Sequence, residues 1–358
     1  MNVLIFLIAL FYSLANMLDY NSQIKMLFQF SSLSLILFLL IKNKFKGVKY
    51  TNLQLFFALL TVIGFISFKS TVFKPITLIN FLLPFIIVGL AVSDDREKQI
   101  IKGLVMPYFF VLPIIFLQYL DVKFAWDIRA LIPAPGGSPT ALDQMYGARP
   151  FGLSYYSITL SEQLALMLPL MIHSFYGRLF ISVITGTKSL MLGIGLYKLL
   201  ELHKRFKVKP IDFIFKASLG ILALIIAYDI LVIIWDSLGR EHQKSFTIRI
   251  AILDGYFGTD FMSMLPDFLQ HREKFDIANY APHNYFITLF MLNNTVSGII
   301  AIWLFLITFT KISFNNPYFP VVFISYVNSM FHNGGLISGI HLLFLLTLLA
   351  FRKELQLK

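Results

Sequence analysis

The stretch "VITGTKSLMLGIG", Val183 to Gly195, decides how the chain is arranged, because it places the charge of Lys188 inside an apolar run. A lysine at the centre of a lipid-buried helix costs about 2.5–3.5 kcal/mol on insertion scales. The segment 178–200 therefore either crosses a membrane once with a misplaced charge, or forms two short helices that turn round near Gly186. The choice between these two arrangements determines on which side of the membrane every later loop lies.

The composition assigns the chain to the membrane proteins. Hydrophobic residues make up 57%, charged residues only 14%, and the mean hydropathy is +0.75. Long apolar runs without alternation predict helices rather than a barrel, since only these two structures satisfy backbone groups in lipid. We expect an all-α, polytopic membrane protein with about 10 to 12 transmembrane helices. The clearest predicted spans are 2–18, 26–41, 52–68, 76–92, 100–120, 154–175, 213–235, 285–309, 316–331 and 334–351.

The positive charges predict the topology. Lysine and arginine gather in short loops such as "KNKFKGVK", 42–49, and "HKRFKVK", 203–209, so the net charge of +11 is typical of cytoplasmic anchoring rather than of nucleic-acid binding. A single crossing at 178–200 would put 203–209 and the C-terminal "FRKELQLK" outside. A broken hairpin near 178–200 keeps every basic loop inside, and we therefore predict the hairpin.

This topology defines one integral membrane domain, 1–358, with both termini cytoplasmic. Its two long loops, 121–153 and 236–284, are extracytoplasmic, and function concentrates in such loops. The run 2–18 lacks a basic flank, which favours a first membrane helix over a cleaved signal. The chain has no cysteine and no histidine pair at metal-binding spacing, so we expect neither a metal nor a cofactor.

Three ionisable residues lie inside predicted spans at similar depth: Glu162, Lys188 and Asp229. Because each is costly in lipid, we expect them to line one outward-facing cavity and to bind substrate there. The alternative is a salt bridge from Lys188 to Glu162 or Asp229 that only holds helices together.

Two polar clusters stand at the outer ends of spans. "GARPFGLSYYS", 147–157, presents Arg149, whose guanidinium is suited to phosphate oxygens or, alternatively, to anchoring at lipid headgroups. "NYAPHNYFITLF", 279–290, presents His283, a candidate general base or a polar helix cap. The residues of these clusters and of the second long loop that we expect to contact substrate are Arg240, Arg272, Asn284 and Tyr285.

These clusters, in this order, resemble the O-antigen ligase and O-antigen polymerase family of bacterial membrane glycosyltransferases. The resemblance covers about residues 145–310 and lies in "RPFGLSYYS", "TGTKSLMLGIG", "GREHQKSFTIRIAIL" and "APHNYFITLF". It implies a multi-pass enzyme of the bacterial cytoplasmic (inner) membrane that uses undecaprenyl-pyrophosphate-linked oligosaccharide. By this resemblance Arg149 and Arg249 bind the pyrophosphate, and His283 orients or deprotonates the acceptor. Lys188 stands near a position where the family commonly has arginine.

Several activities remain open. A polymerase joins lipid-linked repeat units and works with a chain-length regulator, whereas a ligase transfers the finished glycan to a lipid core. A transporter of lipid-linked glycan would also use intramembrane charges, and a structural subunit would need none of these clusters. We favour the polymerase, with membrane lipids as the other partner and no nucleic acid.

Overall fold

The computed structural model describes residues 2–18, 22–42, 48–66, 75–132, 149–154, 157–205, 295–330 and 340–357. Within these residues every regular element is an α-helix, which confirms the predicted all-α class. The helices are α1 (Asn2–Met17), α2 (Ser22–Lys42), α3 (Asn52–Ile66), α4 (Pro75–Leu90), α5 (Asp94–Tyr119), α6 (Lys123–Ala130), α8 (Ser157–Met171), α9 (Phe175–Ile184), α10 (Lys188–Arg205), α15 (Thr295–Lys311), α16 (Phe319–Ser329) and α17 (Ile340–Leu357).

The helices follow the predicted apolar runs closely. Nine predicted spans coincide with a described helix in whole or in part, while the run 213–235 lies outside the described residues. Within the described part of the chain, α2 over Gln23–Lys42 and α5 over Asp94–Tyr119 are long and apolar enough to cross a membrane.

Helix α5 forms the centre of one half of the bundle, where it packs against α1. Gly103 of α5 allows the two backbones to approach closely, because a Cβ there would stand 2.4 Å from the Phe6 carbonyl oxygen. The Ser13 hydroxyl of α1 donates to the Leu104 carbonyl at 2.6 Å and adds a buried hydrogen bond to the same contact. In the other half, α16 packs against both α8 and α10.

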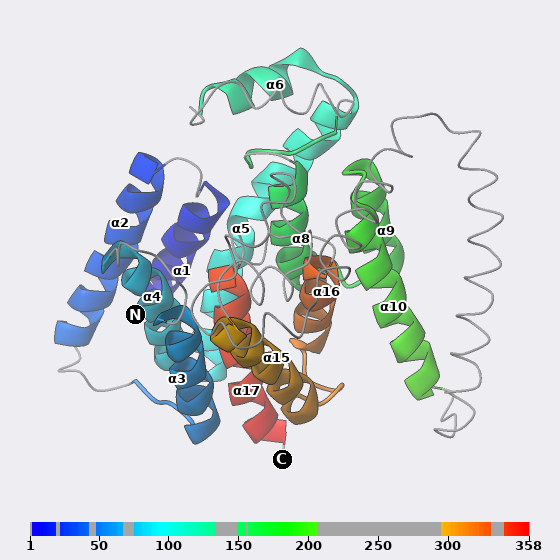
Figure 1. The fold of residues 1–358 in the computed structure, drawn as a ribbon. Coiled ribbons are helices and arrows are strands. Elements are labelled where there is room, and N and C mark those ends of the chain that lie inside the picture. Colours follow the sequence, from blue (N-terminus) through cyan, green and yellow to red (C-terminus); the bar gives the residue numbers. More distant parts are fainter. Residues whose placement is uncertain are drawn as a thin grey trace.

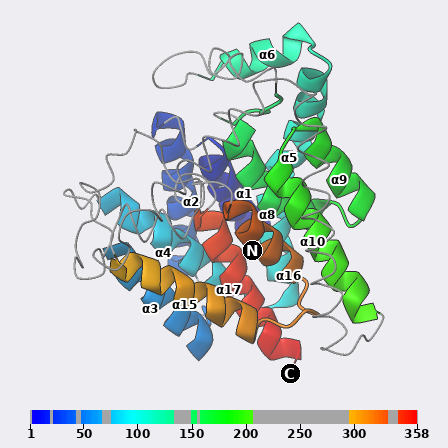
Figure 2. The ribbon, with the colours of Figure 1, turned by 45° about the vertical axis from the view of Figure 1, so that its right-hand side comes forward.

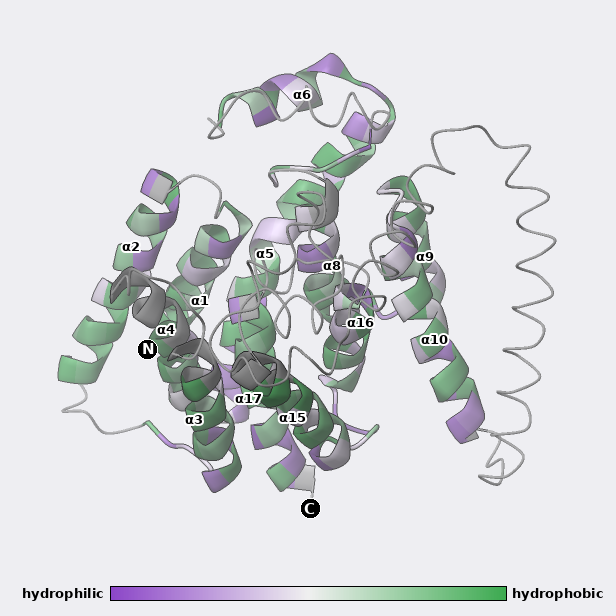
Figure 3. Ribbon diagram, viewed as in Figure 1, coloured by the Kyte–Doolittle hydropathy of each residue, from purple (hydrophilic) through white to green (hydrophobic). Residues whose placement is uncertain are grey.

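The outer helices carry large apolar side chains on their exposed surface. Figure 3 shows apolar colouring along α2 and α3, each of which places some apolar side chains in the core and leaves others exposed. Phe110 of α5 remains 65% exposed and Leu27 of α2 63% exposed. Other exposed apolar side chains are Phe30, Phe38 and Ile41 on α2, Phe109 and Phe116 on α5, and Trp303 and Leu306 on α15.

The segment 178–200 is a helical hairpin, as predicted. Helix α9 ends at Ile184 and α10 begins at Lys188. The two helices are antiparallel, because the Lys198 amine of α10 lies over the Phe175 ring at the start of α9, 5.8 Å from its centroid. The hairpin turns at Gly186, whose φ of +65° is favourable for glycine.

Backbone hydrogen bonds close the end of α9 at this turn. The Thr187 N–H donates to the Ser182 carbonyl at 3.1 Å, and the Gly186 N–H donates to the Val183 carbonyl at 2.9 Å. This pair of bonds is the Schellman motif, which requires a left-handed residue just past the helix. The turn is therefore encoded locally by Gly186.

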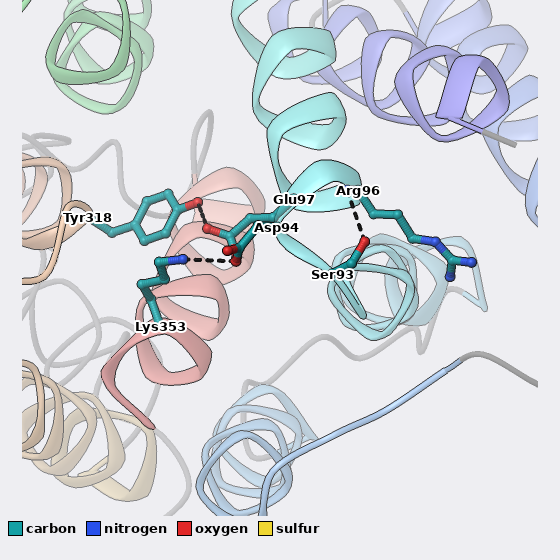
Figure 4. A network of polar contacts seen from close by, with 6 residues as sticks. All are labelled: Ser93, Asp94, Arg96, Glu97, Tyr318 and Lys353. Atoms are coloured by element: carbon teal, nitrogen blue, oxygen red, sulfur yellow. Dashed lines mark hydrogen bonds and ion pairs between the residues drawn. The ribbon is translucent and has the colours of Figure 1, made fainter. Parts of the chain in front are cut away.

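Polar side chains join the helices at the end of the bundle that holds the C-terminus (Figure 1, Figure 2). The Tyr318 hydroxyl, just before α16, donates to Glu97 of α5 at 2.6 Å, and Lys353 of α17 pairs with Asp94 at 3.0 Å, as Figure 4 shows. Lys204, near the end of α10, bonds to Asn315 at the same end. These contacts therefore gather at one end of the bundle, and α6 lies across the other.

Candidate functional site

The segment 149–154, which carries Arg149, is fixed to the end of α5 by one buried side chain. Gln118 is 1% exposed and lies in the last turn of α5. Its Oε1 accepts hydrogen bonds from the N–H groups of Phe151, at 3.0 Å, and Gly152, at 2.7 Å, and its Nε2 donates to the Gly152 carbonyl at 3.0 Å. One amide thus satisfies three backbone groups of a loop that lacks regular structure.

Helix α6 covers this segment from above. Its Arg129 is 1% exposed, donates from Nε to the Ser154 carbonyl at 2.8 Å, and lies over the Phe151 ring. The Trp126 ring also packs beside Phe151, with centroids 5.3 Å apart. The sequence predicted a loop at 121–153 and missed this helix, whose eight residues are too few to produce a clear apolar period.

The far end of the segment is tied to α8 and α1. The Ser154 hydroxyl donates to Gln163 Oε1 at 2.7 Å, and the Gln163 Nε2 donates to the carbonyls of Asn16 and Met17 at 3.2 and 3.3 Å. Gly152 between these anchors has a φ of +58°, so the segment bends in a conformation that favours glycine. Arg149 therefore projects from a loop with fixed anchors on α1, α5, α6 and α8.

Arg149 lies against the tip of the α9–α10 hairpin. A Cβ added at Gly186 would stand 3.6 Å from the Arg149 Cδ and 3.7 Å from its Nε. The sequence predicted Arg149 at the outer end of a span and a hairpin whose tip faces the same side, and the structure brings the two together across 37 residues of sequence.

Lys188 lies at this tip, as the first residue of α10, and its side chain is exposed. Its charge is therefore not buried in an apolar helix. Glu162 of α8 is only 6% exposed, so it belongs to the interior beneath the tip. Each of these residues is next in sequence to a serine of one hydrogen-bonded cluster. Ser161 precedes Glu162, Ser189 follows Lys188, and both serines bind Asn328.

Asn328 is a buried polar junction that the sequence reading missed. Its Oδ1 accepts hydrogen bonds from Ser189 of α10 at 2.7 Å and from Ser161 of α8 at 3.1 Å, and the residue is 1% exposed. Among the described residues its Nδ2 has no hydrogen-bond partner, which is rare for a buried amide donor. The signal in the sequence was an asparagine inside the apolar run 316–331, a position where a polar side chain needs partners.

The remaining predicted site residues lie outside the described part of the chain. The predictions for the second long loop and its neighbouring spans therefore stay predictions. These residues are Asp229, Arg240, Arg249, Arg272, His283, Asn284 and Tyr285.

The described part of the site is suited to an anion. Arg149 offers a planar guanidinium with paired donors, and Lys188 offers a second cation at the same turn. The first turn of α10 begins here too, and the N-terminus of a helix carries a partial positive charge and directs N–H groups outward. Phosphate oxygens match all three features.

Comparison with known proteins identifies no relative. No protein-family model, no curated protein and no solved structure matches this chain.

Proposed function

We propose that this chain is a multi-pass glycosyltransferase of the bacterial cytoplasmic membrane. It polymerises undecaprenyl-pyrophosphate-linked oligosaccharide repeat units on the outer face of that membrane. The observation that carries the proposal is the contact between Arg149 and the hairpin tip at Gly186, next to Lys188. Two cations and a helix N-terminus at the hairpin tip are suited to a pyrophosphate headgroup.

The exposed apolar surface supports the membrane assignment. A water-soluble monomer rarely exposes many large apolar side chains together, whereas lipid tails cover them without cost. Phe110, Leu27 and Trp303 are all more than half exposed on three different helices. We propose 10 to 12 spans, of which α2 and α5 are the clearest described examples.

The distribution of basic residues supports the orientation. Lys204 and Lys353 lie at the end of the bundle where α5 begins, through contacts with Asn315 and Asp94. The positive-inside rule assigns that end to the cytoplasm. Arg149 and α6 then face the outer side, where lipid-linked glycans are joined.

The hairpin has the dimensions of a segment that enters the membrane and returns. Helix α9 has 10 residues and is about 15 Å long, which is half of a hydrocarbon core of roughly 30 Å. Helix α10, with 18 residues, is about 27 Å long and reaches the basic end. The tip therefore lies at a depth where the headgroup and first sugars of a lipid-linked substrate are accessible.

The proposed reaction is a displacement at the anomeric carbon of the donor sugar. An acceptor hydroxyl forms the new C–O bond, the bond to the pyrophosphate breaks, and undecaprenyl pyrophosphate leaves with the electron pair. Arg149 and Lys188 stabilise the negative charge of the leaving group by hydrogen bonds and by Coulomb attraction. His283, predicted from the sequence, accepts the hydroxyl proton.

The test is transfer by the purified protein in lipid nanodiscs. Lipid-linked repeat units are supplied alone or with a lipid-core acceptor, and products are separated by gel. A ladder of longer chains supports the polymerase, whereas transfer only to the added core means that the protein is a ligase. A folded protein that yields no product in either case overturns the enzyme assignment.

Matched variants connect the activity to the site. Arg149→Ala removes both the paired guanidinium donors and the positive charge. We expect a loss of activity of about tenfold to a hundredfold, as for one charged hydrogen-bond donor. Arg149→Lys keeps the charge and recovers part of the activity. Lys98→Ala, an exposed lysine near the other end of α5, is the control that leaves activity unchanged.

A further inference from the structure

We propose that Asn328 is the inner end of the pyrophosphate site, where its Nδ2 donates a hydrogen bond to a phosphate oxygen of the bound lipid headgroup. This inference rests on the proposed function. Asn328 is distant in sequence from Arg149 and Lys188, and it adds a second helix, α16, to the loop 149–154 and α10, which contact the ligand.

The first step is the unused donor. Asn328 is 1% exposed, and the hydroxyls of Ser161 and Ser189 both donate to its Oδ1. Its Nδ2 has no acceptor among the residues that the structure describes. A buried donor without an acceptor loses its water hydrogen bonds without compensation, so an occupant that supplies an oxygen stabilises the site.

The second step is the orientation of the amide. Hydroxyl groups can donate or accept, but here Ser161 and Ser189 both donate to Oδ1, from α8 on one side and α10 on the other. Two donors on one oxygen hold the amide so that Nδ2 keeps its hydrogens for another partner. The hydroxyls are therefore positioning groups, and Nδ2 is the group that contacts the ligand.

The third step is the position. Ser189 is the second residue of α10 and follows Lys188, which stands at the hairpin tip beside Gly186 and Arg149. Ser161 precedes Glu162 on α8. Asn328 therefore lies beneath the first turn of α10, and an anion held by Arg149 and that helix N-terminus presents an oxygen toward the interior.

The chemistry of the ligand follows from the donor. An amide NH₂ group only donates hydrogen bonds, so its partner must be an acceptor with free lone pairs, such as an oxygen. The cations at the hairpin tip favour an oxygen that belongs to an anion. Phosphate oxygens satisfy both requirements. We therefore expect Asn328 to affect binding of undecaprenyl pyrophosphate even when no sugar is attached.

The experiment measures the affinity of undecaprenyl pyrophosphate, free of sugar, for the protein in nanodiscs, and the thermal unfolding midpoint of each variant. Asn328→Asp keeps an acceptor for both serine hydroxyls but replaces the donor by a negative charge. We expect it to lower affinity on the order of tenfold to a hundredfold, because a charged hydrogen bond is lost and a repulsion is added. If Asn328→Asp does not fold, Asn328→Ala is used, with an expected loss of about tenfold.

Two controls distinguish a direct contact between Asn328 and the ligand from an effect on the stability of the fold. The double variant Ser161→Ala with Ser189→Ala removes both positioning hydroxyls but keeps Nδ2, so it lowers the unfolding midpoint with an affinity loss smaller than that of Asn328→Asp. Ser329→Ala removes a hydroxyl that donates to the Ser325 carbonyl of its own helix, at 2.8 Å, and it leaves affinity unchanged.

The outcomes are distinct. Affinity of Asn328→Asp within about threefold of the original protein overturns the inference, as does a serine double variant that loses as much affinity as Asn328→Asp. Binding that depends on Asn328 only when the glycan is attached also overturns it, because the acceptor is then a sugar oxygen. If the unaltered protein binds no undecaprenyl pyrophosphate at all, the proposed function itself fails.

Discussion

The side chain of Arg149 lies against Gly186, so that a methyl group at Gly186 would stand 3.6 Å from the Arg149 Cδ, an ordinary contact distance. Space alone therefore permits alanine, but the backbone does not. Gly186 has a φ of +65°, which costs an L-residue about 1–2 kcal/mol. We expect Gly186→Ala to lower the free energy of unfolding by about that amount and to reduce activity, because the hairpin tip moves relative to Arg149.

The matched control for this substitution is Gly195→Ala on α10. In the described part of the chain, nothing beyond the backbone of α10 itself lies within 4 Å of a Cβ added at Gly195, so alanine there raises stability by about 0.5–1 kcal/mol through helix propensity. Gly186→Asn is the conservative variant, since asparagine adopts positive φ at low cost. Equal stability of Gly186→Ala and Gly195→Ala in denaturant titrations contradicts this account of the turn.

Gln118→Leu tests whether one amide holds the Arg149 segment. The substitution leaves the N–H groups of Phe151 and Gly152 and the Gly152 carbonyl without their partner, and each unsatisfied buried group costs about 1–3 kcal/mol. We expect either failure to fold or faster proteolysis within 149–154. The neighbouring Tyr119, 54% exposed, supplies the control: Tyr119→Ala leaves the proteolysis rate unchanged. If the segment 149–154 resists proteolysis as well in Gln118→Leu as in the unaltered protein, contacts other than the Gln118 amide hold it in place.

The sequence predicted the helices well because apolar length is a strong local signal. The run 2–18 became α1 (Asn2–Met17), and the broken hairpin followed from the positions of Lys204 and other loop charges. The break itself has a local cause in Gly186, whose Schellman hydrogen bonds require no distant partner.

The site was predicted only where a charge marked it. Lys188 was identified because it is a charge inside an apolar run, and Arg149 because it stands at the outer end of a predicted span, but Gln118 and Asn328 were missed. Neutral amides carry no signal about which distant backbone groups they will bind. Asn328 meets Ser161 across 167 residues, and only the packing of α16 against α8 brings the two together.

Gly103→Ala tests the close packing of α5 on α1. The added Cβ would stand 2.4 Å from the Phe6 carbonyl oxygen and 2.9 Å from the Leu10 nitrogen, both backbone atoms that cannot rotate away. We expect the helices to separate and the free energy of unfolding to fall by about 1–3 kcal/mol, as for other overpacked contacts. The measurement is thermal unfolding in detergent, and the reference is again Gly195→Ala, which adds the same methyl group in open space. A Gly103→Ala midpoint equal to that reference would show that α1 adjusts freely.

Tyr318 provides a prediction about pH at the basic end of the bundle. Its hydroxyl donates to Glu97 at 2.6 Å, and burial, followed by the charge and hydrogen bond of Glu97, raises the pKa of the Tyr318 phenol well above its ordinary value of about 10. The folded state therefore favours the protonated phenol more than the unfolded state does. This contribution to stability is complete below pH of about 10 and is lost as the pH rises further toward the folded pKa.

Tyr318→Phe removes both the hydrogen bond and this pH dependence. We expect it to lower the free energy of unfolding by about 1.5–3 kcal/mol at pH 7, because Glu97 Oε1 loses a buried donor. Between roughly pH 10 and 11 the unaltered protein loses stability faster, so the difference between the two proteins narrows. Tyr176→Phe, at a tyrosine that is 79% exposed, keeps the stability of the unaltered protein at pH 7. A difference between Tyr318→Phe and the unaltered protein that stays constant up to pH 11 contradicts the raised pKa, since the phenol then titrates equally in both states.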